Sequence, residues 1–143
     1  MHNKMNEFKL CLYIKEFNTI INTEISERLK HKCLTQSQIT AIKFVAHKKK
    51  ITLTELSEMM SIKKSTCSGI VDRLEAMDIF ERVRDEKDKR ISYVQFSEKG
   101  KILADEIKDD MNGVFADIFK DVPKETLDIV GSKLQEIRDI IKK

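Results

Sequence analysis

Two groups of polar side chains in this sequence are suited to binding an anionic partner. The first group combines two lysines with three hydroxyl side chains: Lys63, Lys64, Ser65, Thr66 and Ser68. In the second group, Asp85-Glu86-Lys87-Asp88-Lys89-Arg90, all six residues are charged. Lysine, arginine and hydroxyl groups donate hydrogen bonds to phosphate oxygens, so both groups predict contacts with nucleic acid. We find no nucleophile beside a base, no acid–base pair and no phosphate-binding loop, and we therefore predict that the chain is not an enzyme.

The first group lies at the start of a predicted helix that runs from Lys64 to Met77. One side of this helix repeats apolar residues at helical spacing: Cys67, Ile70, Val71, Leu74 and Met77. The opposite side is small and polar, with Arg73 on its flank. The capping-box sequence Thr52-Leu-Thr-Glu55 predicts an earlier helix that begins near Thr54 and buries Leu56, Met59 and Met60. Residues 61–63 separate the two helices, which is typical of a helix-turn-helix whose second helix enters the major groove of DNA.

The second group forms the tip of a predicted β-hairpin, because residues 80–84 and 91–96 on either side are short and β-prone. A basic side chain on such a wing can reach the minor groove of DNA, and we assign this role to Arg90, with Asp88 placed to orient its guanidinium. Three further cations are expected to neutralise phosphates: Arg84, Lys87 and Lys89. Two simpler interpretations remain open, namely that the hairpin is only a solvated turn and that the lysines at 63–64 are ordinary surface residues. The ordered combination of helix, turn, helix and charged hairpin favours DNA binding.

The remaining segments are also predicted to be helical. A helix over residues 7–30 has one apolar face: Leu10, Ile14, Phe17, Ile21 and Ile25. The next helix runs from Thr35 to about His47, closes on three lysines at 48–50, and turns four residues inward: Ile39, Ile42, Val45 and Ala46. Ser97 is expected to cap a helix with the seam Leu103, Ile107, Met111, Val114 and Ile118. Pro123 is placed just inside the last helix, whose residues Leu127, Val130, Leu134, Ile137 and Ile141 have coiled-coil spacing and predict a partner helix.

Composition agrees with one mainly helical domain over residues 1–143 and with a cytoplasmic protein. Residues 1–94 carry 18 Lys or Arg against 13 Asp or Glu, whereas residues 95–143 carry 9 against 11, so the basic charge is concentrated in the first part. No apolar run is long enough for a membrane span, and the first ten residues lack the features of a signal peptide. Cys11, Cys33 and Cys67 are too widely spaced for a disulfide framework or a metal pair, and the three histidines are scattered. We expect neither a metal nor a cofactor.

The chain resembles the MarR family of bacterial regulators over nearly its whole length. Seven motifs carry this resemblance: Leu34-Thr35 with Gln38, Leu53-Thr-Glu-Leu56, Ser65-Thr66, Ile70-Val-Asp-Arg-Leu74, Arg82, Asp88-Lys-Arg90, and Phe96-Ser-Glu-Lys-Gly100. The chain departs from the family pattern at Gly69, where many members carry a basic residue, and at Asp78, which replaces a glycine after the recognition helix. Aspartate tolerates the left-handed backbone of such a turn, so we expect the turn to be retained.

The resemblance implies a winged helix-turn-helix over residues 34–96, with dimerisation helices at 1–33 and 97–143. The recognition-helix contacts of the family then fall on residues 63–66 and 68, and its wing pair falls on Asp88 and Arg90. Residues beyond 97 are expected to face a second copy, so that a homodimer reads the two half-sites of a palindromic operator in double-stranded DNA. A winged-helix module that binds other proteins is the alternative.

Family members often release DNA when a small aromatic or phenolic ligand, or an oxidant, acts near the junction of the dimer and reader helices. The resemblance therefore implies a repressor that such a signal releases. Leu10-Cys11-Leu12-Tyr13 loosely resembles the cysteine region of the family's peroxide-sensing branch, so Cys11 is a candidate redox sensor, although we favour a buried structural cysteine. Cys67 is expected to be part of the core because it lies on the apolar side of the recognition helix.

Overall fold

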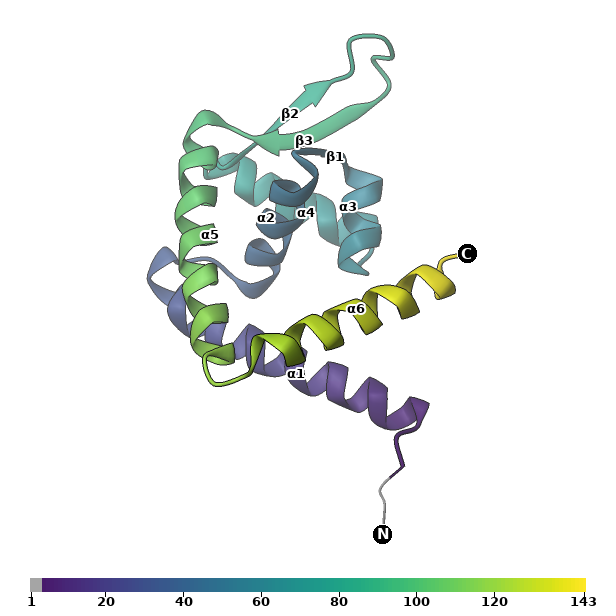
Figure 1. The fold of residues 1–143 in the computed structure, drawn as a ribbon. Helices are drawn as coiled ribbons and strands as arrows, with labels where there is room; N and C mark the ends of the chain where they lie inside the picture. The colour runs from purple at the N-terminus through teal and green to yellow at the C-terminus, as the bar shows by residue number, and fades with distance from the viewer. Residues whose placement is uncertain (1–3) are drawn as a thin grey trace.

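The computed structural model describes residues 4–143, which form a mainly helical body from which a β-hairpin projects (Figure 1). The helices are α1 (Glu7–Arg28), the 3-10 turn η1 (Lys30–Lys32), α2 (Gln36–Lys48), α3 (Leu53–Met60), α4 (Lys64–Ala76), α5 (Glu98–Phe119) and α6 (Lys124–Ile141). The strands are β1 (Lys50–Thr52), β2 (Phe80–Arg84) and β3 (Ser92–Phe96). This order agrees with the predicted winged helix-turn-helix between additional helices. Across the described residues, no helix combines the length and the apolarity that a bilayer span requires.

The hairpin belongs to a three-stranded antiparallel sheet with the strand order β1-β3-β2. In the pairing of β1 with β3, Ile51 lies opposite Val94. In the pairing of β2 with β3, Phe80 lies opposite Phe96 and Arg84 lies opposite Ser92. We did not predict β1, because a strand of three residues is too short for an alternating pattern and we assigned its lysine to the end of α2. The short strand β1 matters because it anchors the base of the wing to the segment between α2 and α3.

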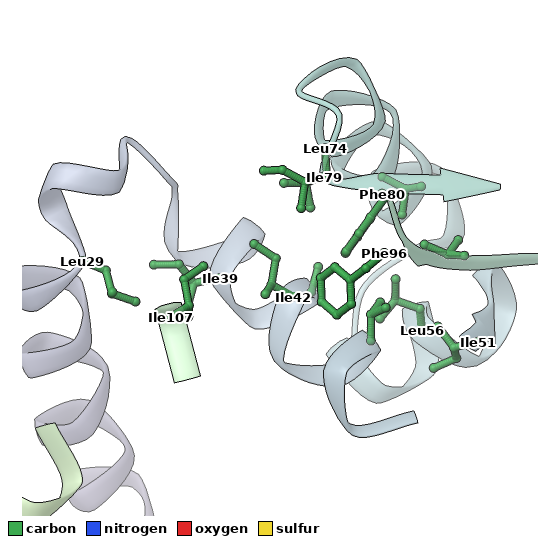
Figure 2. Packing of buried hydrophobic residues seen from close by; sticks show 14 of the residues in the cluster. Leu29, Ile39, Ile42, Ile51, Leu56, Leu74, Ile79, Phe80, Phe96 and Ile107 are labelled. Carbon is green, nitrogen blue, oxygen red and sulfur yellow. The ribbon is translucent and has the colours of Figure 1, made fainter. Parts of the chain in front are cut away.

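Apolar side chains from most of the elements meet in one core. Leu29, Ile39 and Ile107 lie together at one end of it, whereas Leu56, Phe80 and Phe96 pack at the other, near the sheet (Figure 2). The rings of Phe80 and Phe96 meet edge to face with centroids 5.5 Å apart, a favourable geometry for aromatic pairs. The helix-turn-helix and the wing therefore share a core with the helices that flank them.

The seam of α5 is buried within its own chain, which corrects our expectation for these side chains, whereas the expectation that α6 faces a second copy stays a prediction. Ile107, Met111 and Val114 are 2%, 9% and 1% exposed, while Leu103 and Ile118 are half-buried against the same core. The α5 helix packs against α1, and its ion pairs are from Asp117 to Arg28 at the end of α1 and from Glu106 to Lys32 in η1. Spacing alone did not distinguish a partner within the chain from a partner outside it.

The last helix, α6, has no buried residue in the single chain. Its predicted seam is exposed at every position, from 37% at Leu127 and 38% at Ile137 to 77% at Ile141. The first half of α1 is similar, since Ile14 and Phe17 are about half exposed and only Ile25 of that helix is buried. Monomers rarely leave apolar surface of this kind open to water, so both helices present faces that require a partner.

Several local predictions were wrong at element ends. Ala46 and Met77 are exposed, since Ala46 lies in the last turn of α2 and Met77 is the C-cap that follows α4. The start predicted near Thr54 is confirmed to within one residue, because α3 begins at Leu53 and the Thr52 hydroxyl caps it by accepting a hydrogen bond from the Glu55 amide. Pro123 lies one residue before α6 and is its N-cap. The strand predicted to begin at residue 91 begins at Ser92.

Candidate nucleic-acid interface

Helix α4 packs against the core on one side only, so its other side is accessible to a ligand. Cys67, Val71 and Leu74 are fully buried, whereas Ser65 and Thr66 are exposed and Ser68 is half-buried. The turn before α4 is set by Ser61, whose backbone adopts the left-handed conformation with φ of 56°. A left-handed residue bends the chain sharply, and α4 starts three residues later at Lys64, with Lys63 as its N-cap.

The wing tip is ordered by its own acidic side chains. The Asp85 carboxylate accepts a hydrogen bond from the Asp88 amide at 3.0 Å, and the Asp88 carboxylate accepts one from the Arg90 amide at 3.1 Å. The Asp85 and Ile91 backbones close the loop, since the Asp85 amide donates to the Ile91 carbonyl at 2.9 Å. We did not assign a role to Asp85, although aspartate is common in turns because its side chain accepts hydrogen bonds from nearby backbone amides. The acidic residues of the tip thus build the loop that carries the cations.

Asp88 also holds the Arg90 side chain, as we predicted. Its two carboxylate oxygens accept hydrogen bonds from Nε at 3.0 Å and from Nη2 at 3.2 Å of the Arg90 guanidinium. These hydrogen bonds, with the one from the Arg90 amide, lower the pKa of the Asp88 carboxyl from its ordinary value. The Arg90 side chain is nevertheless 91% exposed. The guanidinium is therefore oriented and remains accessible to a ligand.

Arg82 links the wing to the recognition helix, a role that the sequence did not show. It extends from β2, and its guanidinium contacts Asp72 through Nη2 at 2.6 Å and Glu75 through Nε at 3.5 Å. Both acids lie on α4, so one cation joins the two elements that would contact DNA. The same contacts neutralise two carboxylates that would otherwise repel phosphates.

The base of the wing is fixed to the start of α5 by Ser97 and Gly100. The Ser97 hydroxyl donates to the Asp78 carbonyl at 2.6 Å and accepts from the Gly100 amide at 2.9 Å, which confirms Ser97 as the cap of α5. A Cβ atom at Gly100 would lie 1.9 Å from the Ile79 carbonyl oxygen, so only glycine fits there. Asp78 has φ of 57°, as we predicted for the residue that replaces a glycine. These contacts explain why the serine and the glycine of Phe96-Ser-Glu-Lys-Gly100 occur together.

The predicted DNA-contacting cations lie on α4, beside its start, and on the wing. Within residues 4–143, six of them form no ion pair: Lys63, Lys64, Arg73, Arg84, Lys87 and Lys89. All six are exposed. The structure therefore brings the predicted cations to two neighbouring elements and leaves their charges available.

A groove of about 900 Å³ separates α2, β3 and α5 on another part of the surface. Its walls are largely apolar and include Ile42, Phe96, Ala104, Met111 and Phe115. Its ammonium groups are those of Lys43, Lys49, Lys101 and Lys108, against the single acid Asp105. Lys43 is half-buried, and this burial lowers the pKa of its ammonium group. The combination suits a small apolar anion.

The three cysteines differ in exposure. Cys67 is buried as predicted, and its burial raises the pKa of the thiol, which opposes formation of the reactive thiolate. Cys11 is exposed in the single chain, so our preference for a buried structural cysteine there was wrong. Cys33 is exposed as well and has a left-handed backbone. In the part of the chain that the structure describes, no three His, Cys, Asp or Glu side chains gather as metal ligands would.

Residues 34–92 match the sequence model of the MarR family. Among curated proteins, the chain is 22% identical over 130 residues to the uncharacterized HTH-type transcriptional regulator YsmB of Bacillus subtilis, covering 91% of this chain and 89% of YsmB. It is 24% identical over 87 residues to the HTH-type transcriptional repressor MdtR of the same organism, covering 61% of this chain and 56% of MdtR.

Solved structures share the fold over almost the entire chain. A MarR family protein from Bacillus stearothermophilus superposes with a TM-score of 0.76 at 24% identity, covering 98% of this chain and 100% of that one. A mutant MarR from E. coli in complex with operator DNA gives 0.76 at 18% identity, covering 93% and 99%. CouR from Rhodococcus jostii RHA1, bound to p-coumaroyl-CoA, gives 0.78 at 18% identity, covering 90% of each chain. The chain therefore has a winged helix-turn-helix fold, and its residues 34–92 are similar to the MarR family.

Proposed function

We propose that this protein is a sequence-specific regulator of transcription that binds double-stranded DNA as a homodimer. The observation that carries the proposal is a surface formed by α4 and the wing together. The α4 helix exposes its hydroxyl and cationic side chains, and the ion pair of Arg82 with Asp72 joins this helix to the wing. On the wing, the Asp88 carboxylate orients the exposed guanidinium of Arg90. The solved complex of a MarR with operator DNA, which has the same fold, supports this interpretation.

The geometry suggests a division of roles at the DNA. The first turn of α4 enters the major groove, where Ser65, Thr66 and Ser68 meet base edges and phosphates. Lys63 and Lys64 neutralise the backbone at the helix start, where the positive end of the helix dipole adds to their charge. Arg90 reaches the minor groove from the wing tip, and the cations beside it, with Arg84 and Arg73, contact flanking phosphates.

The test is selection of duplexes from a random-sequence library by the purified protein, followed by affinity measurements at several salt concentrations. A regulator should enrich a palindrome, and the logarithm of its affinity should fall steeply and linearly with the logarithm of salt concentration. A protein that enriches no sequence and shows no steep dependence on salt would instead be a winged-helix module for protein partners, and the proposal would be wrong.

The homodimer is inferred from the two open apolar faces, on α6 and on the first half of α1. A helix with coiled-coil spacing and no buried residue is stable only when another helix covers its seam. Replacing Leu134 and Ile137 with aspartate should give monomers that bind the selected duplex weakly, because two recognition helices are needed for two half-sites. Sedimentation of the variant as a stable dimer would contradict this interface.

We further propose that a small aromatic or phenolic ligand in the groove between α2 and α5 releases the DNA. The groove borders α5, which packs on α1, and it also borders β3 of the wing. A bound ligand can therefore alter the distance between the recognition helices of the two protomers. CouR, bound to p-coumaroyl-CoA, offers a structural precedent for a ligand in this fold. Added p-coumarate or benzoate should weaken DNA binding in the native protein but not in Lys43→Met, which loses the half-buried cation. An equal response of the two proteins would place the ligand elsewhere.

Repression and oxidant sensing are separate parts of the proposal. The relative MdtR is a repressor, and binding at an operator blocks transcription whenever the site overlaps a promoter. Mapping of occupied sites, with transcript measurements after deletion of the gene, should show increased transcription beside those sites. Cys11 is exposed in the single chain, and a thiol sensor there requires that it stay accessible beside the dimer contact proposed for the first half of α1. Peroxide should release DNA from the native protein and not from Cys11→Ser, and a response that persists in the variant would exclude this residue.

A further inference from the structure

Gly69 occupies the middle of α4, where glycine disfavours the helix and nothing in the chain requires it. Glycine in a helix interior is less favourable than alanine because it has more backbone freedom to lose on folding. No glycine among the described residues has a positive φ, so backbone conformation does not explain this one. A Cβ atom at Gly69 would have no heavy atom within 4 Å outside its own helix backbone, so packing does not explain it either.

At two other positions, Gly100 and Gly113, contacts within the chain explain why the residue is glycine. A Cβ atom at Gly100 would lie 1.9 Å from a backbone oxygen, and one at Gly113 would lie 3.3 Å from the Arg28 guanidinium. Only Gly131 resembles Gly69 in having open space around it, and it lies on α6, whose apolar face also lacks a partner. The unexplained glycines are therefore on surfaces that the single chain leaves uncovered.

The position of Gly69 points to the partner that explains it. On the helix it lies opposite Cys67, Val71 and Leu74, which are fully buried, and four residues after Ser65, one turn away on the same exposed side. Cations without an ion pair lie on both sides of it along α4, at Lys64 and Arg73. A polyanion that contacts the exposed side of α4 between these charges would lie beside Gly69.

We propose that Gly69 provides steric clearance for DNA, so that α4 inserts into the major groove to a depth that any side chain at this position prevents. The inference rests on the proposed function. Recognition by this helix then depends on the short groups around Gly69, the hydroxyls of Ser65 and Thr66, which reach the bases only when the helix backbone lies close to them. Gly69 is thus a specificity-determining position because it lacks a side chain.

The test compares the change in melting temperature with the change in DNA affinity, because the proposal predicts that stability rises while affinity falls. Gly69→Ala should raise the melting temperature by about 2–4 °C, because alanine favours the helix and no atom obstructs it. The same variant should bind the duplex selected by the native protein about threefold or more weakly, and Gly69→Leu about tenfold or more weakly, which corresponds to about 1.4 kcal/mol. Ser132→Ala, on the exposed polar side of α6, is the matched control, and it should gain stability without loss of affinity.

Three results would overturn the proposal. Undiminished binding of that duplex by Gly69→Ala would show that DNA tolerates a side chain there. A lower melting temperature of Gly69→Ala would show that the chain itself needs glycine. An equal loss of affinity in Ser132→Ala would make the loss a general effect of stabilisation. The native protein separates these results from failure of the proposed function, since a native protein that enriches no duplex would contradict the function itself.

Discussion

Removal of the Arg90 guanidinium is the most direct test of the wing. The Arg90 side chain is 91% exposed and its only ion pair in the described chain is with Asp88, so Arg90→Ala should change the free energy of unfolding by less than about 0.5 kcal/mol. Thermal unfolding should therefore be nearly unaltered. Any change in DNA binding would then reflect the lost contact and not a damaged fold.

The size of the expected loss follows from the nature of the contact. A hydrogen bond that involves a charged group contributes about 1.5 kcal/mol or more, and a dimer carries two wings, so the loss is about 3 kcal/mol per dimer, or about 150-fold in affinity. If each Arg90 neutralises one phosphate or its equivalent, the slope of log affinity against log salt should become shallower by about 1.8. Fluorescence anisotropy with a labelled duplex at several KCl concentrations measures both quantities.

Asp88→Ala separates orientation of Arg90 from simple charge. Electrostatics alone predicts tighter binding when a carboxylate beside DNA is removed. The structure predicts weaker binding, because the variant frees the guanidinium that two carboxylate oxygens hold at 3.0 Å and 3.2 Å and also removes the acceptor of the Arg90 amide. In the Asp88→Ala background, the further change Arg90→Ala should cost less than it does in the native protein. Tighter binding by Asp88→Ala, or unchanged binding by Arg90→Ala, would refute the reasoning about the wing.

Three more predictions concern the residues that support the wing. Gly100→Ala should lower the free energy of unfolding by about 3 kcal/mol, because its Cβ atom would displace the Ile79 carbonyl and strain the hydrogen bonds of Ser97. Chemical denaturation measures this loss. Native-like stability of the variant would mean that α5 can shift to make room for the side chain. Arg82→Gln should lower the free energy of unfolding by less than about 1 kcal/mol, because the ion pairs of Arg82 are exposed. The variant should bind DNA more weakly, with an unchanged slope of log affinity against log salt concentration. A slope shallower by about one unit or more would instead assign Arg82 to phosphate contact. The Asp88 carboxyl has a lowered pKa, so its support of the wing is complete above the ordinary value of 3.8 and is lost only as pH falls through the lowered pKa; an NMR titration should place its midpoint below 3.8, and Arg90→Ala should raise that midpoint.

Much of the fold was predictable from local patterns. The helix at 64–76, the cap at Ser97 and the left-handed turn at Asp78 all depend on side chains that act within a few residues of their own backbone. The charged hairpin was predictable for the same reason, since a β-prone segment on either side of six charged residues leaves few other structures. The nearness of Asp88 to Arg90, two residues apart, is local as well.

Features that join distant segments were not predictable in this way. The pairing of Arg82 with Asp72 and Glu75 requires the angle between β2 and α4, and the fit of Gly100 against Ile79 requires the angle between α5 and the turn before β2. The strand β1 forms because β3 offers it a free edge and not because its own three residues favour a strand.

The apolar seams show most clearly how sequence and tertiary structure divide the information. Spacing along the chain determined that α5 and α6 each have one apolar face, because a helical period of 3.6 residues places those side chains on one side. Only the tertiary structure decided which partner each face has: α5 turns Ile107 and Val114 into the core of its own chain, whereas α6 leaves Leu134 and Ile137 exposed. The physical reason is that hydrophobic burial depends on area removed from water and not on which segment or chain removes it, so a pattern predicts burial without naming the partner.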